Sequence, residues 1–178
     1  MIGSTIDFAK ELWLRHEENK KEKEYLCIKV SSMFDKFIHS GYAVVCDNGL
    51  FQGGHDSDGC RSPQVSLPIF ETELENVNWK SLPVKLMYEI LDFPNEVENA
   101  NYKIQGAMEF ESLPPDYKEG FEERQYQYAL LCVKAFEISS KLRKESNLPK
   151  KIYEWDIIEN MSDKISEINI LKKDKVEE

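Results

Sequence analysis

The feature that most constrains the fold is a long amphipathic stretch from Pro115 to Asn147. Its apolar residues recur at steps of three and four, which places them along one side of an α-helix. They are Phe121, Tyr128, Leu131, Cys132, Ala135, Phe136, Ile138 and Leu142. A helix of this length is a rod of roughly 45 Å, and such a rod buries one side only against helices of similar length. The sequence therefore predicts a mainly all-α fold, an antiparallel helical bundle.

Three other stretches show the same periodicity. We expect a long N-terminal helix over 1–40, a helix over 83–111 that Pro94 kinks or interrupts, and a last helix over 157–170 capped by Asp156. Gly41 is expected to end the first helix, because glycine is common just after a helix C-terminus.

The chain length sets the number of domains. With 178 residues it is long enough for one sizeable core and short for two. We therefore predict a single helical domain over 1–178. Its helical core is expected in 81–171, with an irregular insertion at 41–80 and a frayed tail at 172–178.

The insertion has a different character from the rest of the chain. An Asn48-Gly49 pair between apolar residues is typical of a short hairpin, because Asn-Gly favours tight two-residue turns. A stretch rich in glycine, serine and aspartate follows it. We expect an irregular loop with a short hairpin around 42–70, and loops of this length commonly bind something or are mobile.

Four residues of the insertion are of types that bind metals. Cys46, His55, Asp58 and Cys60 supply two thiolates, an imidazole and a carboxylate, all of which zinc accepts as ligands. Their spacing matches no zinc pattern, and the loop lacks the acidic positions of a calcium site. We expect polar turns and no cofactor. The alternative is a zinc site in a small metal-dependent enzyme that uses the 46–60 loop.

Composition excludes several classes of function. The net charge of −10 argues against nucleic acid or an anionic membrane as a partner. No run of eighteen apolar residues occurs, and no G-x-S-x-G, Walker A or G-x-G-x-x-G motif is found. The N-terminus mixes acids and bases, unlike a signal peptide. We therefore predict a cytoplasmic protein without membrane insertion, whose four cysteines are reduced thiols.

The N-terminal helix carries the candidate interaction surface. Its first apolar cluster is Phe8, Leu12 and Trp13, and the charged stretch 15–24 separates this cluster from the next apolar residue, Leu26. Exposed clusters that contain tryptophan commonly mark protein contacts. We predict that this cluster binds a protein partner or a second copy of the chain. The alternative is that the apolar stretch 152–155 folds back and covers it.

Acidic residues are concentrated in the middle of the chain. Between Glu71 and Gln125 there are thirteen acidic and five basic side chains, a net charge of −8. Such a surface suits fast association with a basic site. We therefore predict a non-enzymatic helical interaction or scaffold protein, with an acidic inhibitor or immunity-type protein as one alternative to it.

Two segments also resemble a recurring pair in uncharacterised bacterial helical proteins. They are LPVKLMYEILDFPNEVENANYKI, residues 82–104, and the stretch from Pro114 to Pro149. Some members of that family carry an N-terminal hydrophobic helix, whereas this chain begins with a charged amphipathic one. The resemblance implies a bacterial helical domain and no assigned activity, cofactor or site residue.

Overall fold

The computed structural model of the chain describes residues 3–51 and 54–177, and for residues 3–7, 9, 155 and 175–177 it describes the backbone alone. It contains four long helices: α1 (Gly3–Cys46), α2 (Val84–Gly106), α3 (Lys118–Glu145) and α4 (Ile157–Glu177). A π-helical turn at Ala107–Glu111 extends α2, and 3-10 turns lie at Trp79–Ser81 and Glu154–Asp156. The predicted all-α helical bundle is confirmed.

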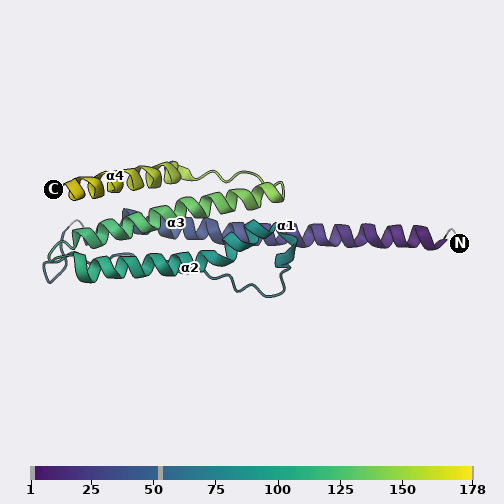
Figure 1. The fold of residues 1–178 in the computed structure, drawn as a ribbon, viewed down its shortest axis with the longest axis horizontal. Helices are drawn as coiled ribbons and strands as arrows, with labels where there is room; N and C mark the ends of the chain where they lie inside the picture. The colour runs from purple at the N-terminus through teal and green to yellow at the C-terminus, as the bar shows by residue number, and fades with distance from the viewer. Residues whose placement is uncertain (1–2, 52–53, 178) are drawn as a thin grey trace.

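Helix α3 is the centre of the bundle. It contacts α1, α2 and α4, and Figure 1 shows that it runs opposite to all three. Because α1 and α2 run in the same direction, the segment that joins them must return along the whole bundle. This topology explains why the connection between Cys46 and Val84 is so long.

The core holds a cluster of aromatic rings contributed by three helices and by the connecting segment. Phe70 of that segment lies 4.5 Å from Phe34 of α1 and 4.9 Å from Phe93 of α2, measured between ring centroids. Phe37 of α1 and Tyr128 of α3 complete the cluster, with 6.2 Å between their centroids. Phe70 therefore fixes the connecting segment between α1 and α2.

The predicted end of the first helix at Gly41 is wrong, and so is the hairpin. Helix α1 continues to Cys46, with Val44 and Val45 buried on it. A Cβ atom at Gly41 would lie 2.3 Å from Sγ of Cys132, so this glycine allows α1 and α3 to approach closely. Within the described ranges, the only β-type pairing is an isolated bridge between Phe51 and Gly54.

Two expectations about the later helices also need correction. Of the two alternatives for Pro94, the interruption is wrong, because Pro94 lies inside a continuous α2; the kink stays a prediction. Phe93 and Val97 on either side of it are buried, and this packing offsets the backbone hydrogen bond that proline cannot make. The tail was expected to fray from Lys172, but α4 remains helical to Glu177, and Nζ of Lys172 lies 2.6 Å from the Glu123 carboxylate. Asp156 ends the 3-10 turn that precedes α4 and has a φ of 47°.

Candidate functional site

The first part of α1 projects from the bundle as a single helix, which we call the stalk (Gly3–Glu22). Figure 1 shows the N-terminal part of α1 extending beyond the other helices. Among the side chains of α1 that the structure describes, the first buried ones are Leu26 and Cys27. At 1.5 Å per residue, the stalk extends over roughly 30 Å.

The predicted interaction residues all lie on the stalk and are exposed. The exposed fraction is 62% for Phe8, 50% for Leu12 and 61% for Trp13. Leu14 is 44% exposed. A helix without tertiary packing on any side depends on its own backbone and i,i+4 pairs, such as the 2.6 Å contact between Arg15 and Glu11. Four large apolar side chains in so short a segment favour a contact surface.

The segment 152–155 does not cover the stalk. Tyr153 packs instead on the body of the bundle, with its ring centroid 5.5 Å from that of His39 and 5.9 Å from that of Phe136. Ile152 is exposed, and the Trp155 side chain lies outside the described part of the structure. The alternative in which this segment folds back over Phe8 and Trp13 is therefore wrong.

A buried carboxylate holds this segment to the bundle. Asp35 of α1 accepts hydrogen bonds from Ser139 at 3.0 Å, from Arg143 at 2.5 Å and from the Tyr153 hydroxyl at 2.7 Å. Burial and the bond to the Asp35 carboxylate both raise the pKa of Tyr153. The phenol therefore remains a neutral donor. This network joins α1, α3 and the segment that leads to α4.

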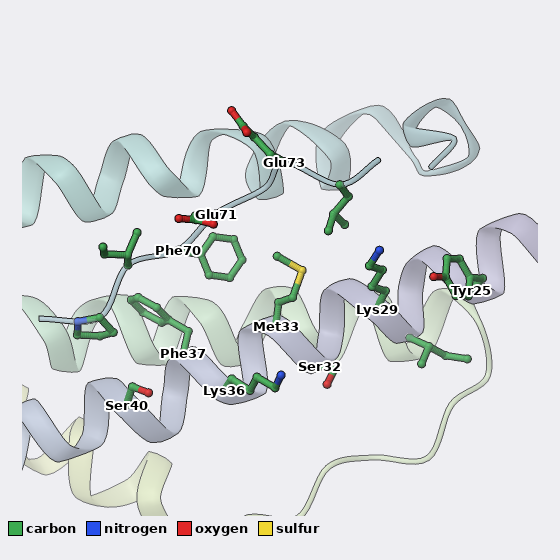
Figure 2. A pocket seen from close by; sticks show the side chains of 14 residues that line it. Tyr25, Lys29, Ser32, Met33, Lys36, Phe37, Ser40, Phe70, Glu71 and Glu73 are labelled. Atoms are coloured by element: carbon green, nitrogen blue, oxygen red, sulfur yellow. The ribbon is translucent and has the colours of Figure 1, made fainter. Parts of the chain in front are cut away.

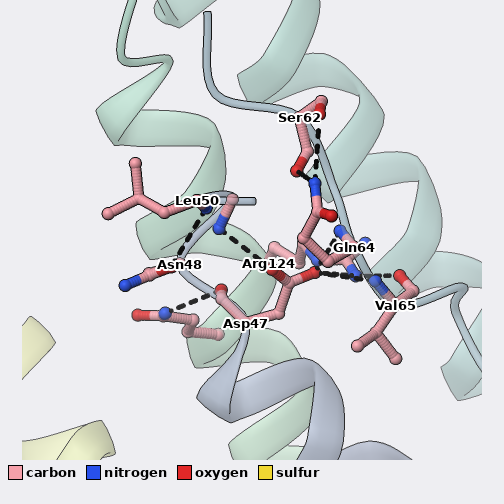
Figure 3. A network of polar contacts seen from close by, with 9 residues as sticks. Asp47, Asn48, Leu50, Ser62, Gln64, Val65 and Arg124 are labelled. Carbon is pink, nitrogen blue, oxygen red and sulfur yellow. Dashed lines mark hydrogen bonds and ion pairs between the residues drawn. The ribbon is translucent and has the colours of Figure 1, made fainter. Parts of the chain in front are cut away.

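A second buried network fixes the start of the α1–α2 connection (Figure 3). Oδ1 of Asp47 accepts from the backbone N–H of Gly49, and Oδ2 accepts from the N–H groups of Gln64 and Val65, all at 2.9–3.0 Å. Arg124 of α3 lies 3.1 Å from the same Oδ2 and also donates to the Val65 carbonyl. Both charged side chains are at least 96% buried.

The return of the connecting segment along α1 creates a groove (Figure 2). The hollow has a volume of about 740 Å³. Its α1 side runs from Tyr25 to Ser40, and its opposite wall is the segment 68–74. A neighbouring hollow of about 720 Å³ shares Tyr25 and continues to Glu22. Together they extend the groove to the base of the stalk.

Lysines and glutamates line opposite sides of this groove. Lys29 and Lys36 belong to α1, whereas Glu71 and Glu73 belong to the wall. The apolar residues at its floor include Met33 and Phe37. A groove with an apolar floor and charged edges fits a peptide or a helix better than a small polar ligand.

Two of the candidate zinc ligands make other side-chain contacts. His55 lies 3.2 Å from Asp116, and Sγ of Cys60 lies 3.9 Å from the Asp58 carbonyl oxygen, while the backbone N–H of Cys60 donates to Asp56 at 2.9 Å. Cys46 is exposed at the end of α1. Over residues 3–51 and 54–177, no three His, Cys, Asp or Glu side chains come together in a group that could hold a metal. The loop geometry is that of a hydrogen-bonded turn around Asp56.

Comparisons with protein-family models, curated proteins and solved structures gave no match. The resemblance of 82–104 and 114–149 to bacterial helical proteins therefore stays a prediction. Among the described helices, none is long and apolar enough to cross a membrane.

Sequence reasoning missed both buried networks and the groove. Asp35 and Arg143 are separated by 108 positions, and Asp47 and Arg124 by 77. Local patterns carry no information about pairs so distant. One signal was present: both aspartates lie on or just after apolar helical stretches, where a charged residue without a partner is costly.

Proposed function

We propose that the protein is a non-enzymatic helical interaction protein of the cytoplasm, and that its stalk binds another protein chain. The observation that carries this proposal is the exposure of Phe8, Leu12 and Trp13 on a helix that no other described element covers. Aromatic side chains at the centre of a contact supply much of the binding free energy.

The bundle supports this function by holding the base of the stalk. Lys23 lies 2.7 Å from Glu145 at the end of α3, and the Asn78 amide donates to Glu22 at 3.2 Å. Beyond these contacts α1 extends past the other helices (Figure 1). The stalk is therefore presented in one direction by a packed body, as in a scaffold protein.

The test uses the double variant Leu12→Asp/Trp13→Asp. Both side chains are exposed, so the change leaves the bundle and its far-ultraviolet spectrum intact. We expect the variant to lose association, measured as capture of a partner protein from a bacterial lysate. The matched control is Val84→Asp/Tyr88→Asp on α2, where two residues that are 74% and 65% exposed are changed in the same way. Equal association of the wild type and the stalk variant would contradict the proposal.

The acidic-inhibitor function is a second candidate, supported by the exposed carboxylates of Glu71, Glu73 and Glu75. Other acids of this region are used inside the bundle: Glu89 lies 2.7 Å from Lys141, and Glu96 pairs with Lys134. Association with a basic partner would slow steeply as salt is added. A contact centred on the apolar side chains of Leu12 and Trp13 would respond little to salt.

The metal-dependent enzyme is the remaining alternative and has the least support. His55 and Cys60 stand in a turn built by backbone hydrogen bonds to Asp56. Metal analysis of protein purified without chelator separates this class from the other two. Stoichiometric zinc that is lost in a His55→Ala variant would favour it.

A further inference from the structure

An exposed stripe runs along α1 from the stalk onto the bundle. Leu14, Glu18, Lys21, Tyr25 and Ile28 follow one another at steps of three and four, so they share one side of the helix. All five are exposed. The opposite side of α1 carries Cys27 and Phe34, which face the core. The stripe therefore looks away from the bundle along its whole length.

This stripe is complementary to itself when two copies run antiparallel. In the register that sets Glu18 of one copy opposite Lys21 of the second, Leu14 comes opposite Tyr25. Ile28 comes opposite Glu11, whose carboxylate then lies next to Lys29. If a two-fold axis relates the two copies, each of these pairs occurs twice in the dimer. Opposite charges and apolar side chains thus match in a single register, as expected of an isologous contact.

The groove provides room for the second stalk. In the same register the stalk of the second copy runs along α1 from Tyr25 towards Lys36, and Gly3 comes opposite Lys36. This is the part of α1 that lines the groove. Ser32, one of its lining residues, has a small side chain that allows a close approach of another helix.

The side of the stalk that would meet the groove wall carries Phe8. Phe8 and Met33 are separated by about seven full helical turns, so they lie on the same side of α1. When a two-fold axis normal to the plane of the two helix axes relates two antiparallel helices, the same side of each helix lies on the same side of that plane. Phe8 of one copy therefore lies beside Met33 of the second, at the floor of the groove.

Arg15 adds charge complementarity on that side. It lies two helical turns after Phe8 and thus faces the same wall. The wall carries the exposed acids Glu71 and Glu73, and the exposed Glu75 directly follows it. Trp13 lies on the other side of the stalk and takes no part in this contact.

We infer that the stalk binds a second copy of this chain, with the two α1 helices antiparallel and each stalk in the groove between α1 and residues 68–74 of the other copy. The inference rests on the proposed function and names the partner of the stalk. It leaves Trp13 free for a protein of another kind.

A charge-swap experiment tests the register. Glu18→Lys and Lys21→Glu each place like charges opposite one another in both symmetric pairs. We expect each variant alone to have a dimer association constant lower than that of the wild type by roughly tenfold, measured by sedimentation at low ionic strength. An equimolar mixture of the two variants restores both pairs, so it should form a heterodimer within about threefold of the wild-type constant.

Two controls make the test specific. Lys20→Glu has the same charge change as Lys21→Glu but lies on the opposite side of α1, two turns before Cys27, and should leave the dimer unchanged. Phe8→Ala should weaken the dimer, whereas Trp13→Ala should not, although the two side chains are 62% and 61% exposed. Equal effects of Phe8→Ala and Trp13→Ala, or a mixture no stronger than the single variants, would overturn the inference.

A monomeric wild type at all concentrations up to about 0.5 mM would also overturn it. The proposed function would survive that result if Leu12→Asp/Trp13→Asp still abolished capture of another protein. The two proposals therefore fail on different measurements.

Discussion

At the residue scale, the bundle depends on two buried aspartates, Asp35 and Asp47, that join distant segments of the chain. Asp47 is held by three backbone N–H groups and by Arg124. Burial lowers the pKa of the Arg124 guanidinium and the neighbouring Asp47 opposes this effect. A buried ion pair adds little net stability compared with apolar residues, but removal of one partner leaves a charge without compensation.

Asp47→Ala should therefore be strongly destabilising. We expect the free energy of unfolding in urea to fall by about 3 kcal/mol, because Arg124 and three backbone donors lose their acceptor. Lys141→Ala is the control, since its ion pair with Glu89 is half exposed and should contribute less than about 1 kcal/mol. Similar losses in both variants would contradict the role of Asp47.

We expect the buried Tyr128 to cause a loss of stability at alkaline pH. Burial raises the pKa of Tyr128 to about 12, from an ordinary value of 10.0. Between these two pH values the unfolded chain loses the phenolic proton and the folded chain keeps it, so the stability contribution present below pH 10 is lost as the pH rises towards 12. A shift of this size corresponds to about 3 kcal/mol.

Urea unfolding between pH 8 and about pH 12 measures this effect. The free energy of unfolding should be nearly constant at first and then fall above about pH 10. Tyr128→Phe loses the hydrogen bond from the hydroxyl to Asn101, at 3.0 Å, but should show a smaller alkaline loss. An equal alkaline loss in this variant would assign the effect to other groups, such as Tyr153.

At the element scale, the aromatic side chain of Phe70 anchors the middle of the connection between α1 and α2. Phe70 is 5% exposed and lies between Phe34 and Phe93, whereas its neighbour Ile69 is 81% exposed. Phe70→Ala should lower the free energy of unfolding by about 3–5 kcal/mol. Ile69→Ala should change it by less than about 0.5 kcal/mol. Comparable effects in urea unfolding would show that the segment is not anchored in this way.

The helices could be predicted from sequence because their apolar residues keep a regular spacing over long stretches. Their ends could not. Gly41 was assigned to a helix terminus from its type alone, yet its role is set by Cys132 on another helix. Asn48-Gly49 suggested a hairpin, but Gly49 has a φ of 76° and packs against Phe121. Both glycines serve contacts with α3 that local sequence does not show.

The candidate site was only partly predictable for the same reason. The charged stretch 15–24 separated Phe8, Leu12 and Trp13 from the core in the sequence, and the structure places these residues on the stalk. The groove arises where the segment 68–74 returns along α1. It depends on the parallel direction of α1 and α2, which periodicity alone does not specify.

At the scale of the whole molecule, the contacts of α3 with all three other helices predict one cooperative unit. Single domains of this size commonly unfold in one step. Thermal unfolding followed by near- and far-ultraviolet dichroism should give one shared main transition. Two well-separated transitions would contradict the prediction of one domain.

The stalk is the part of the molecule that this cooperative unit does not stabilise. Isolated helices of its length are marginal in water, so its backbone amides should open far more often than those of α1 from Leu26 to Cys46. An added neighbour on the stalk would remove this difference. The difference in amide opening between the stalk and the rest of α1 therefore reports whether another chain covers the stalk.

Amide hydrogen exchange of peptides from residues 3–22, measured by mass spectrometry as the protein concentration is raised, is the most direct test of the stalk as a binding surface. We predict fast exchange in dilute protein and at least tenfold slower exchange in concentrated protein, with peptides from 26–46 unchanged in their buried part. Slow exchange of residues 3–22 already in dilute protein would show that the chain covers its own stalk, and would contradict the account.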